Sequence, residues 1–174
     1  MIHYGHQSLS DSDFELVLES LKGEYLTNGP LLEEFESKLN HETDAHCIAV
    51  SSGTAALHTA YSAIGVTSGD EVITPPITFI ATQATAVSLG ATIKFVDVDP
   101  DTGLLDVNQV EKAISKKTKA IVTVDYGGCQ ADLFKLKAMI EIKPDAQTRP
   151  PAKKSRQTRK YITEVSTYLI NNAK

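Results

Sequence analysis

The alternation of short apolar runs with helical patterns constrains the fold of this chain more than any other feature. Apolar runs cover residues 46–50, 71–74, 92–98 and 120–124, and each is followed by a helical pattern or a capped turn. Strands that alternate with helices form a mainly parallel sheet with helices on both faces. The sequence therefore predicts an α/β fold.

Helices are predicted both ahead of these runs and between them. The first has apolar residues at helical spacing over 14–21, cap candidates Ser10 and Ser12, and Gly23 at its end. Pro30 begins a second helix, whose apolar face lies within 31–39. Further along, we expect Thr78 to cap a helix over 79–89 that Gly90 stops, Asp106 to cap one through Ile114, and Asp132 to cap one that begins at Leu133.

Composition excludes several classes of protein. No run of 18 apolar residues occurs, and the first ten residues lack the basic and apolar pattern of a signal peptide, so we expect a cytoplasmic protein without a membrane span. Cys47 and Cys129 lie far apart, and the five histidines are scattered singly. We therefore expect neither a disulfide framework nor a metal site.

Ligands of open α/β sheets bind at the carboxyl ends of the strands, so the residues that follow the apolar runs are the candidates for chemistry. The first run ends in Ser-Ser-Gly-Thr, residues 51–54, and passes directly into an Ala-rich helix. Free backbone N–H groups, a hydroxyl and the positive end of a helix dipole are what a phosphate site requires. From these residues alone, a simple helix cap at Ser52 or Thr54 explains the pattern equally well.

The order of motifs around this turn resembles the DegT/DnrJ/EryC1/StrS family of pyridoxal-phosphate-dependent sugar aminotransferases. The matching segments are YGHQSLSDSD, LTNGPLLEEFE, AVSSGTAALHTAY, GDEVITPPITFIATQATA, FVDVD and TKAIVTVDYGG, which together cover about residues 2–140. The resemblance implies the N-terminal portion of a fold-type-I aminotransferase large domain. HQ, TPPITFIAT and VDYGGCQADL are most similar to the enzymes of the pseudaminic acid pathway that aminate UDP-4-keto-6-deoxy-N-acetyl-L-altrosamine.

The resemblance also implies roles for individual residues. Gly53 and Thr54 fall on the family's phosphate-binding turn, and Phe79 falls on the aromatic residue that covers the cofactor ring; without the resemblance, Phe79 reads as an ordinary core residue. Asp125, Tyr126 and Gly127 would border the site. The substrate side is implied at Tyr4, Thr27 and Gly29, where packing and turn formation are the simpler interpretations.

The implied reaction is transamination of a nucleotide-linked keto sugar, with pyridoxal 5′-phosphate as cofactor and glutamate as amino donor, in a homodimer. It requires a phosphate anchor, an acid beside the pyridine nitrogen and a lysine that forms the Schiff base. The family carries the acid in a motif like EDAAHA and the lysine in a later loop, and neither motif occurs in this chain. No catalytic residue is therefore assigned.

Residues 141–174 differ in composition from residues 1–140. The first 140 residues hold nine lysines, no arginine, 19 acidic residues and all ten glycines, whereas the remaining 34 hold eight basic and three acidic residues, including all three arginines. We expect a divergent basic tail that is largely disordered over 143–160, with a short helix over 161–170. The basic run over 143–160 lacks the interleaved aromatic residues that would favour nucleic-acid binding.

Three interpretations of the tail stay open: a basic binding segment, a substitute source of the lysine, or a lost reading frame. The abrupt change in composition favours the last. The chain is then a truncated aminotransferase that is inactive alone, or else a non-catalytic remnant that acts as a binding or dimerisation module.

Overall fold

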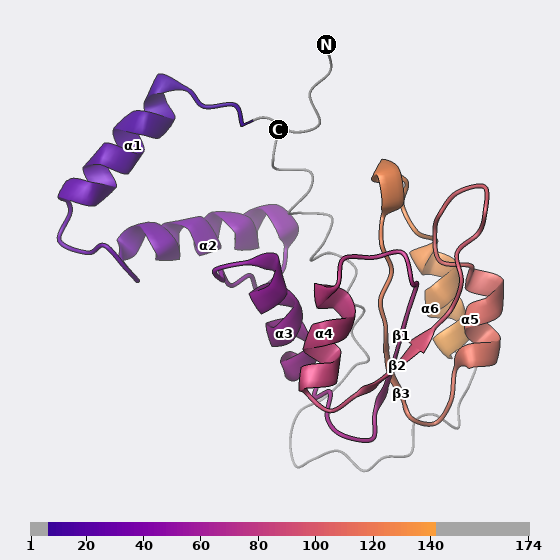
Figure 1. Cartoon of the computed structure of the whole chain (residues 1–174). Helices are drawn as coiled ribbons and strands as arrows, with labels where there is room; N and C mark the ends of the chain where they lie inside the picture. The colour runs from indigo at the N-terminus through magenta and orange to yellow at the C-terminus, as the bar shows by residue number, and fades with distance from the viewer. Residues whose placement is uncertain (1–6, 142–174) are drawn as a thin grey trace. The chain divides into compact units, whose positions relative to one another are not determined.

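A computed structural model describes residues 7–141 (Figure 1). They divide into two compact units, and the boundary lies between residues 51 and 52. The first unit contains helices α1 (Asp11–Lys22) and α2 (Pro30–Thr43). The second contains the sheet with the helices that cover it. The predicted tail and its helix over 161–170 lie outside the described residues, as does Tyr4.

The ends of α1 and α2 follow from local chemistry. Both the backbone N–H and the hydroxyl of Ser10 donate to Asp13 Oδ2 at 2.7 Å, which fixes the first turn of α1. The helix ends at Gly23, and Pro30 is the first residue of α2. These three boundaries confirm the sequence-based prediction. Within the described residues, neither helix has a buried residue, so the apolar face of α1 stays exposed.

The strand expected over 46–50 does not form. The backbone N–H of Cys47 donates to Asn40 Oδ1 at 2.5 Å, and that of Ala49 donates to Glu36 Oε1 at 2.8 Å. Side-chain oxygens of α2 thus accept hydrogen bonds from the backbone N–H groups that a neighbouring strand would otherwise pair with. The prediction was wrong because an apolar run becomes a strand only where another strand is available to pair with it.

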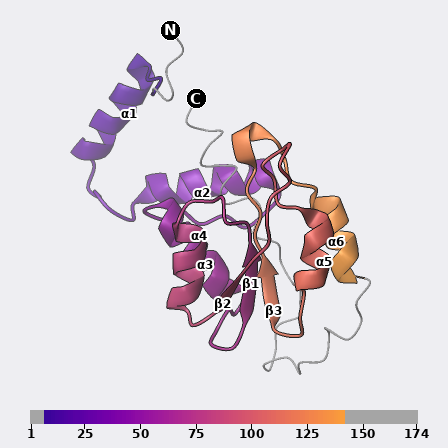
Figure 2. The same cartoon turned by 45° about the vertical axis from the view of Figure 1, so that its right-hand side comes forward.

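Three parallel strands form the sheet, in the order β2-β1-β3 (Figure 2). They are β1 (Glu71–Thr74), β2 (Thr92–Phe95) and β3 (Thr118–Ile121). The central strand β1 has the predicted bounds. The strand β2 ends before the apolar run 92–98 does, because its ladder ends at the last residue of β1. The strand β3 begins two residues before the run 120–124 and ends three residues before its end, so its predicted bounds were wrong.

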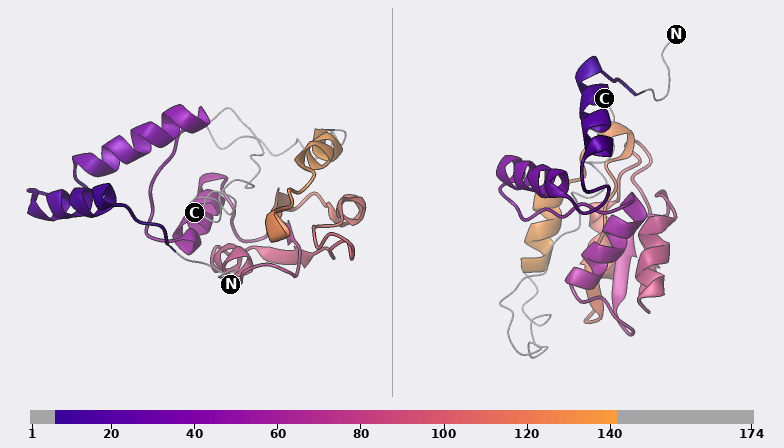
Figure 3. Two further views of the ribbon diagram at one scale, coloured as in Figure 1. Left: turned by 90° about the horizontal axis from the view of Figure 1, so that it is seen from above. Right: turned by 90° about the vertical axis from the view of Figure 1, so that its left-hand side faces the viewer.

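Helices cover both faces of this sheet (Figure 3), as the alternation of apolar runs and helices predicted. On one face, α3 (Gly53–Ala63) and α4 (Ala81–Ser88) pack through a core that includes Tyr61, Val72 and Ala86. On the other, α5 (Val107–Ala113) and α6 (Leu133–Glu141) pack around Ile73 and Leu136. Neighbouring residues of a strand point to opposite faces, so β1 contributes to both cores.

Most of the predicted helix boundaries in this unit are confirmed, and one prediction is wrong. Asp106 caps α5 by accepting a hydrogen bond from the backbone N–H of Asn108, and Asp132 caps α6 in the same way through Lys135. Thr78, however, does not cap α4, which begins at Ala81 and not at residue 79. Its hydroxyl is instead 2.8 Å from the hydroxyl of Thr82 in the first turn of the helix, which competes with capping.

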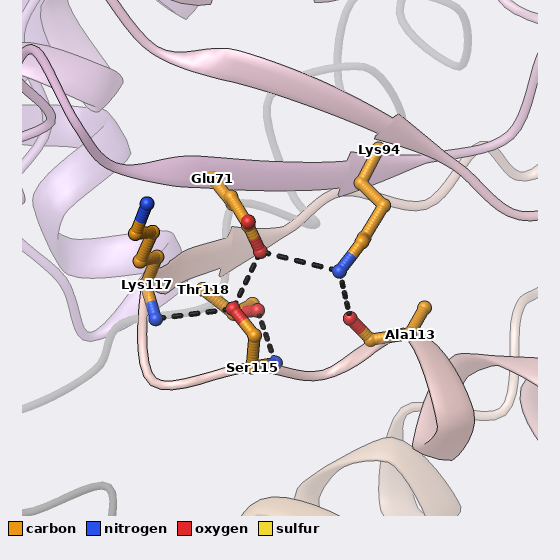
Figure 4. A network of polar contacts seen from close by, with 6 residues as sticks. All are labelled: Glu71, Lys94, Ala113, Ser115, Lys117 and Thr118. Atoms are coloured by element: carbon orange, nitrogen blue, oxygen red, sulfur yellow. Dashed lines mark hydrogen bonds and ion pairs between the residues drawn. The ribbon is translucent and has the colours of Figure 1, made fainter.

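A polar network ties the amino ends of the strands together (Figure 4). Glu71 Oε2 accepts a hydrogen bond from the Ser115 hydroxyl at 2.6 Å and lies 3.4 Å from Lys94 Nζ, which also donates to the Ala113 carbonyl at 2.9 Å. The Ser115 hydrogen bond is the main reason that the pKa of Glu71 lies below its ordinary value. The backbone N–H of Ser115 also donates to the hydroxyl of Thr118, the first residue of β3, at 2.9 Å. The network therefore joins all three strands, toward the edge opposite the one that carries the candidate site.

Candidate active site

The carboxyl edge of the sheet collects the turns that follow the three strands. Residues 75–80 connect β1 to α4, residues 96–106 connect β2 to α5, and residues 122–132 connect β3 to α6. The first turn of α3 lies at the same edge, because its last turn leads through residues 64–70 into the start of β1 (Figure 1). Parallel topology thus brings together the turns that the sequence singled out.

The N-terminus of α3 offers free donors. Ser52 is the cap residue: its hydroxyl accepts from the Ala55 N–H at 3.1 Å, and its carbonyl accepts from the Ala56 N–H at 3.0 Å. Within residues 7–141, the backbone N–H groups of Gly53 and Thr54 have no acceptor, as expected for the first residues of a helix. The cap interpretation and the phosphate interpretation therefore both hold, because they use different N–H groups.

The electrostatics of this helix end favour an anion. The first turn of α3 contains no acidic residue, as in α4, α5 and α6, whereas α1 has Asp11 and Asp13 there, and α2 has Glu33. Acidic side chains in the first turn compensate the positive end of the helix dipole. In α3 that end is left uncompensated, and the Thr54 side chain is exposed beside it. The arrangement suits a phosphate group.

The turn after β1 places a large aromatic side chain in solvent. Phe79 is 75% exposed and Ile80 is 67% exposed, although Pro75, at the start of the turn, is buried. Phe79 is therefore not a core residue in the described part of the chain, and that simpler interpretation was wrong. An exposed aromatic ring on a turn anchored by buried residues can cover one face of a flat ligand.

The turn after β3 is held in a tight loop. The half-buried Asp125 accepts a hydrogen bond from the Ala131 N–H at 3.0 Å, through Oδ1. Between them lies a short 3-10 helix, η1 (Tyr126–Gly128), in which Gly127 has a φ of +62° and Gly128 a φ of +84°. Glycine adopts these left-handed conformations without steric cost. Tyr126 is half exposed at the start of this loop.

The residues predicted for the substrate side are not brought to this edge by any described contact. Thr27 is exposed, and Gly29 is the cap residue of α2, where a Cβ atom would lie 2.8 Å from Tyr25 Cβ. Both belong to the unit of residues 7–51, and Tyr4 lies outside the described residues. Their predicted role remains a prediction.

Two features of this edge were not predicted from the sequence. Ile80 is exposed beside Phe79, although an apolar residue between a strand and a helix is expected to be buried. Thr74, the last residue of β1, is fully buried, and its hydroxyl oxygen has no hydrogen-bond partner within residues 7–141. A polar residue directly after the apolar pair Val72 and Ile73 was the available signal for the second feature.

Other kinds of site find no support in the described residues. Residues 7–141 contain no group of three His, Cys, Asp or Glu side chains placed to hold a metal ion. None of the helices in that range is long and apolar enough to cross a membrane.

Comparison with known proteins identifies the family. The sequence model of the DegT/DnrJ/EryC1/StrS aminotransferase family matches residues 7–143. The chain belongs to the DegT/DnrJ/EryC1/StrS aminotransferases. Membership of this family confirms the resemblance drawn from the motifs of residues 2–140. The match ends close to the point where the composition of the chain changes.

Solved structures of this aminotransferase family share the fold. A sugar aminotransferase from Streptococcus pneumoniae in its PMP form is 32% identical with a TM-score of 0.79, and the alignment covers 83% of this chain and 37% of that one. The same protein in its PLP form is 31% identical with a TM-score of 0.76, and the alignment covers 80% of this chain and 36% of that one. Helicobacter pylori PseC, an aminotransferase involved in the biosynthesis of pseudaminic acid, is 33% identical with a TM-score of 0.74, covering 80% of this chain and 38% of PseC.

The present chain thus spans a little over a third of the length of the aminotransferases that it matches. The parallel sheet with helices on both faces is the portion of the aminotransferase fold that it contains.

Proposed function

We propose that this chain supplies the phosphate-binding and ring-covering part of a sugar aminotransferase that acts on a nucleotide-linked keto sugar. Pyridoxal 5′-phosphate is the cofactor and glutamate the amino donor, and the intact enzyme works as a cytoplasmic homodimer. In domain terms, residues 1–140 form part of the large domain, and residues 141–174 form a divergent basic tail. Family membership and the PLP and PMP forms of a similar aminotransferase support the proposal.

The observation that carries the proposal is the N-terminus of α3. The Gly53 and Thr54 N–H groups and the Thr54 hydroxyl bind the phosphate group, at a helix end with no acidic residue in its first turn. Phe79, on the turn between β1 and α4, covers one face of the ring and excludes water from it. When bound, the cofactor supplies the electron sink that lets an amino group pass between donor and sugar.

A second candidate function has its own support. The sequence contains no EDAAHA-like motif and no lysine in the setting that the family uses, and the chain spans 37% of the first aminotransferase named above. The alternative is therefore a non-catalytic module that binds the phosphorylated cofactor or pairs with a second subunit. Both candidate functions require the cofactor site, but only the first includes catalysis of amino transfer.

The sugar is assigned by motifs alone. The identity to PseC, 33%, nearly equals the 32% to the Streptococcus pneumoniae protein, so the comparisons do not favour one sugar. HQ, TPPITFIAT and VDYGGCQADL favour a UDP-4-keto-6-deoxy sugar of the pseudaminic acid type. Tyr4, Thr27 and Gly29 are the residues proposed to contact it.

Equilibrium dialysis with pyridoxamine 5′-phosphate tests the cofactor site, because this compound cannot form a Schiff base with surface lysines. Gly53→Pro removes one donor at the first helical position, where proline is tolerated, and Asp11→Pro makes the same change at the start of α1. Phe79→Ala removes the exposed ring, and Phe134→Ala removes a ring from α6 that is at least as exposed.

We expect Gly53→Pro and Phe79→Ala each to weaken binding about tenfold, which corresponds to 1.4 kcal/mol, and both control variants to bind as the unchanged chain does. Equal affinities of the site variants and their controls would contradict the proposal. Incubation with glutamate and pyridoxal 5′-phosphate then separates the two candidates. Conversion of pyridoxal 5′-phosphate to pyridoxamine 5′-phosphate would show that this chain holds a working lysine. Binding of the cofactor without this conversion favours the non-catalytic module.

A further inference from the structure

Two loops of the carboxyl edge meet where Gly103 lies against the ring of Tyr126. Gly103 belongs to the loop between β2 and α5 and has a φ of +70°. A Cβ atom at this position would lie 2.8 Å from Tyr126 Cδ1 and 3.2 Å from Cε1. Any other residue would therefore push the ring away, so the position of Tyr126 depends on a glycine in the neighbouring loop.

The loop that carries Gly103 is rigidly braced. The Gly103 N–H donates to the Asp99 carbonyl at 2.8 Å, and the Asp99 N–H donates to the Leu104 carbonyl at 2.8 Å. Asp99 Oδ1 accepts from the N–H groups of Asp101 and Thr102 at 3.0 Å each. Because these hydrogen bonds close the loop on itself, Gly103 presents a fixed surface to the Tyr126 ring.

The side chain of Tyr126 is available to a ligand. Its side chain is 50% exposed, and its hydroxyl makes no hydrogen bond within the described part of the chain. Buried or structural tyrosines usually satisfy the hydroxyl, as Tyr61 does by donating to the Thr82 carbonyl at 2.9 Å. A fixed ring with a free hydroxyl offers a ligand an apolar face and a polar group, at little cost in ordering.

The charges around Tyr126 select the kind of ligand. Asp97, Asp99 and Asp101 lie in the Gly103 loop, and Asp125 directly precedes Tyr126. The carboxylates of the two loops that meet at Tyr126 disfavour a diphosphate there more than they disfavour a neutral, hydroxyl-rich ring. We infer that Tyr126 contacts the sugar ring of the nucleotide-linked substrate, with Gly103 as the residue that positions it. The inference rests on the proposed function, since it takes its ligand from there.

The test uses the full chain with ¹³C-labelled tyrosine and phenylalanine rings. The probes are N-acetylglucosamine, UDP and UDP-N-acetylglucosamine, titrated separately. We expect the Tyr126 ring signals to shift with the two probes that contain the sugar and to stay in place with UDP. Phe14, which is 54% exposed in α1, is the matched control and should not shift with any probe.

Variants separate contact from positioning. Tyr126→Ala should weaken N-acetylglucosamine binding about tenfold in saturation-transfer experiments, and Tyr126→Phe should restore most of it, because the ring supplies most of the contact. Gly103→Ala should abolish the sugar-induced shift of Tyr126. Gly69→Ala is the matched control, since Gly69 has a φ of +89° with open space around it, and this variant should leave the shift unchanged.

Three results would overturn the inference: no Tyr126 shift with either sugar probe, an equal shift with UDP, or the same response in the Gly103 and Gly69 variants. A parallel titration with pyridoxamine 5′-phosphate, read at the Phe79 ring, keeps the two proposals distinguishable. A Phe79 shift with a silent Tyr126 refutes the sugar contact alone. A silent Phe79 refutes the proposed cofactor site.

Discussion

Replacement of Glu71 by glutamine should loosen the amino end of the sheet in a way that depends on pH. The carboxylate accepts a hydrogen bond from the Ser115 hydroxyl at 2.6 Å and lies 3.4 Å from Lys94 Nζ. Hydrogen bonds to charged groups contribute about 1.5–3 kcal/mol, and partly exposed ion pairs less than about 1 kcal/mol. Glutamine keeps one acceptor oxygen for Ser115, so we expect Glu71→Gln to lower the free energy of unfolding by about 1 kcal/mol at pH 7.

The sign of the pH dependence follows from the lowered pKa of Glu71 in the folded state. A depressed carboxyl pKa stabilises the fold above the pKa of the unfolded chain, about 4.3, and this contribution disappears as the pH falls through the folded-state pKa. The difference between the unchanged chain and Glu71→Gln should therefore be constant from pH 7 to about pH 5 and shrink below about pH 4.

Urea unfolding followed by far-ultraviolet circular dichroism measures this difference. Asp101→Asn is the matched control, because it removes one charge from an exposed side chain that makes no hydrogen bond within residues 7–141. The reasoning is refuted if Glu71→Gln unfolds as Asp101→Asn does at pH 7. It is equally refuted if the loss caused by Glu71→Gln persists undiminished at low pH.

Three further changes test the packing of the same unit, each by urea unfolding. Thr74→Val should raise the free energy of unfolding by up to about 1 kcal/mol, because it replaces a fully buried hydroxyl without a described partner by a methyl group of similar size; a loss of stability would indicate a hidden partner. Tyr61→Phe should cost about 0.5–1.5 kcal/mol by removing the buried hydrogen bond to the Thr82 carbonyl, and unchanged stability would show that this hydrogen bond makes no net contribution. Gly90→Ala should cost more than about 1 kcal/mol, since Gly90 has a φ of +89° and a Cβ atom would lie 3.1 Å from Ser68 Cα; unchanged stability would contradict the close packing at the end of α4.

Features set by residues close together in the sequence were predicted well. The Ser10 cap, Pro30 at the start of α2, and the caps Asp106 and Asp132 all depend on contacts within four residues. The bounds of β1 were predicted because its centre, Val72 and Ile73, is apolar and the strand is central to the sheet. Such elements carry their own boundary signals.

Features set by distant partners were missed or could not be predicted. Residues 46–50 have the composition of a strand, but side chains of α2 take their N–H groups. Phe79 looks like a core residue in the sequence, and only the fold shows that its side chain is exposed. The contact between Gly103 and Tyr126 joins loops that are more than 20 residues apart, which no local pattern indicates.

The central claim is that the first turn of α3 binds a phosphate group beside Phe79. Amide ¹H–¹⁵N spectra of the full chain, titrated with pyridoxamine 5′-phosphate and separately with unphosphorylated pyridoxamine, test it most directly. The account predicts that the Gly53 and Thr54 amides show the largest shifts with the phosphorylated compound and do not move with the other. Unmoved Gly53 and Thr54 amides, or larger shifts at another helix start such as Asn108 in α5, would contradict it.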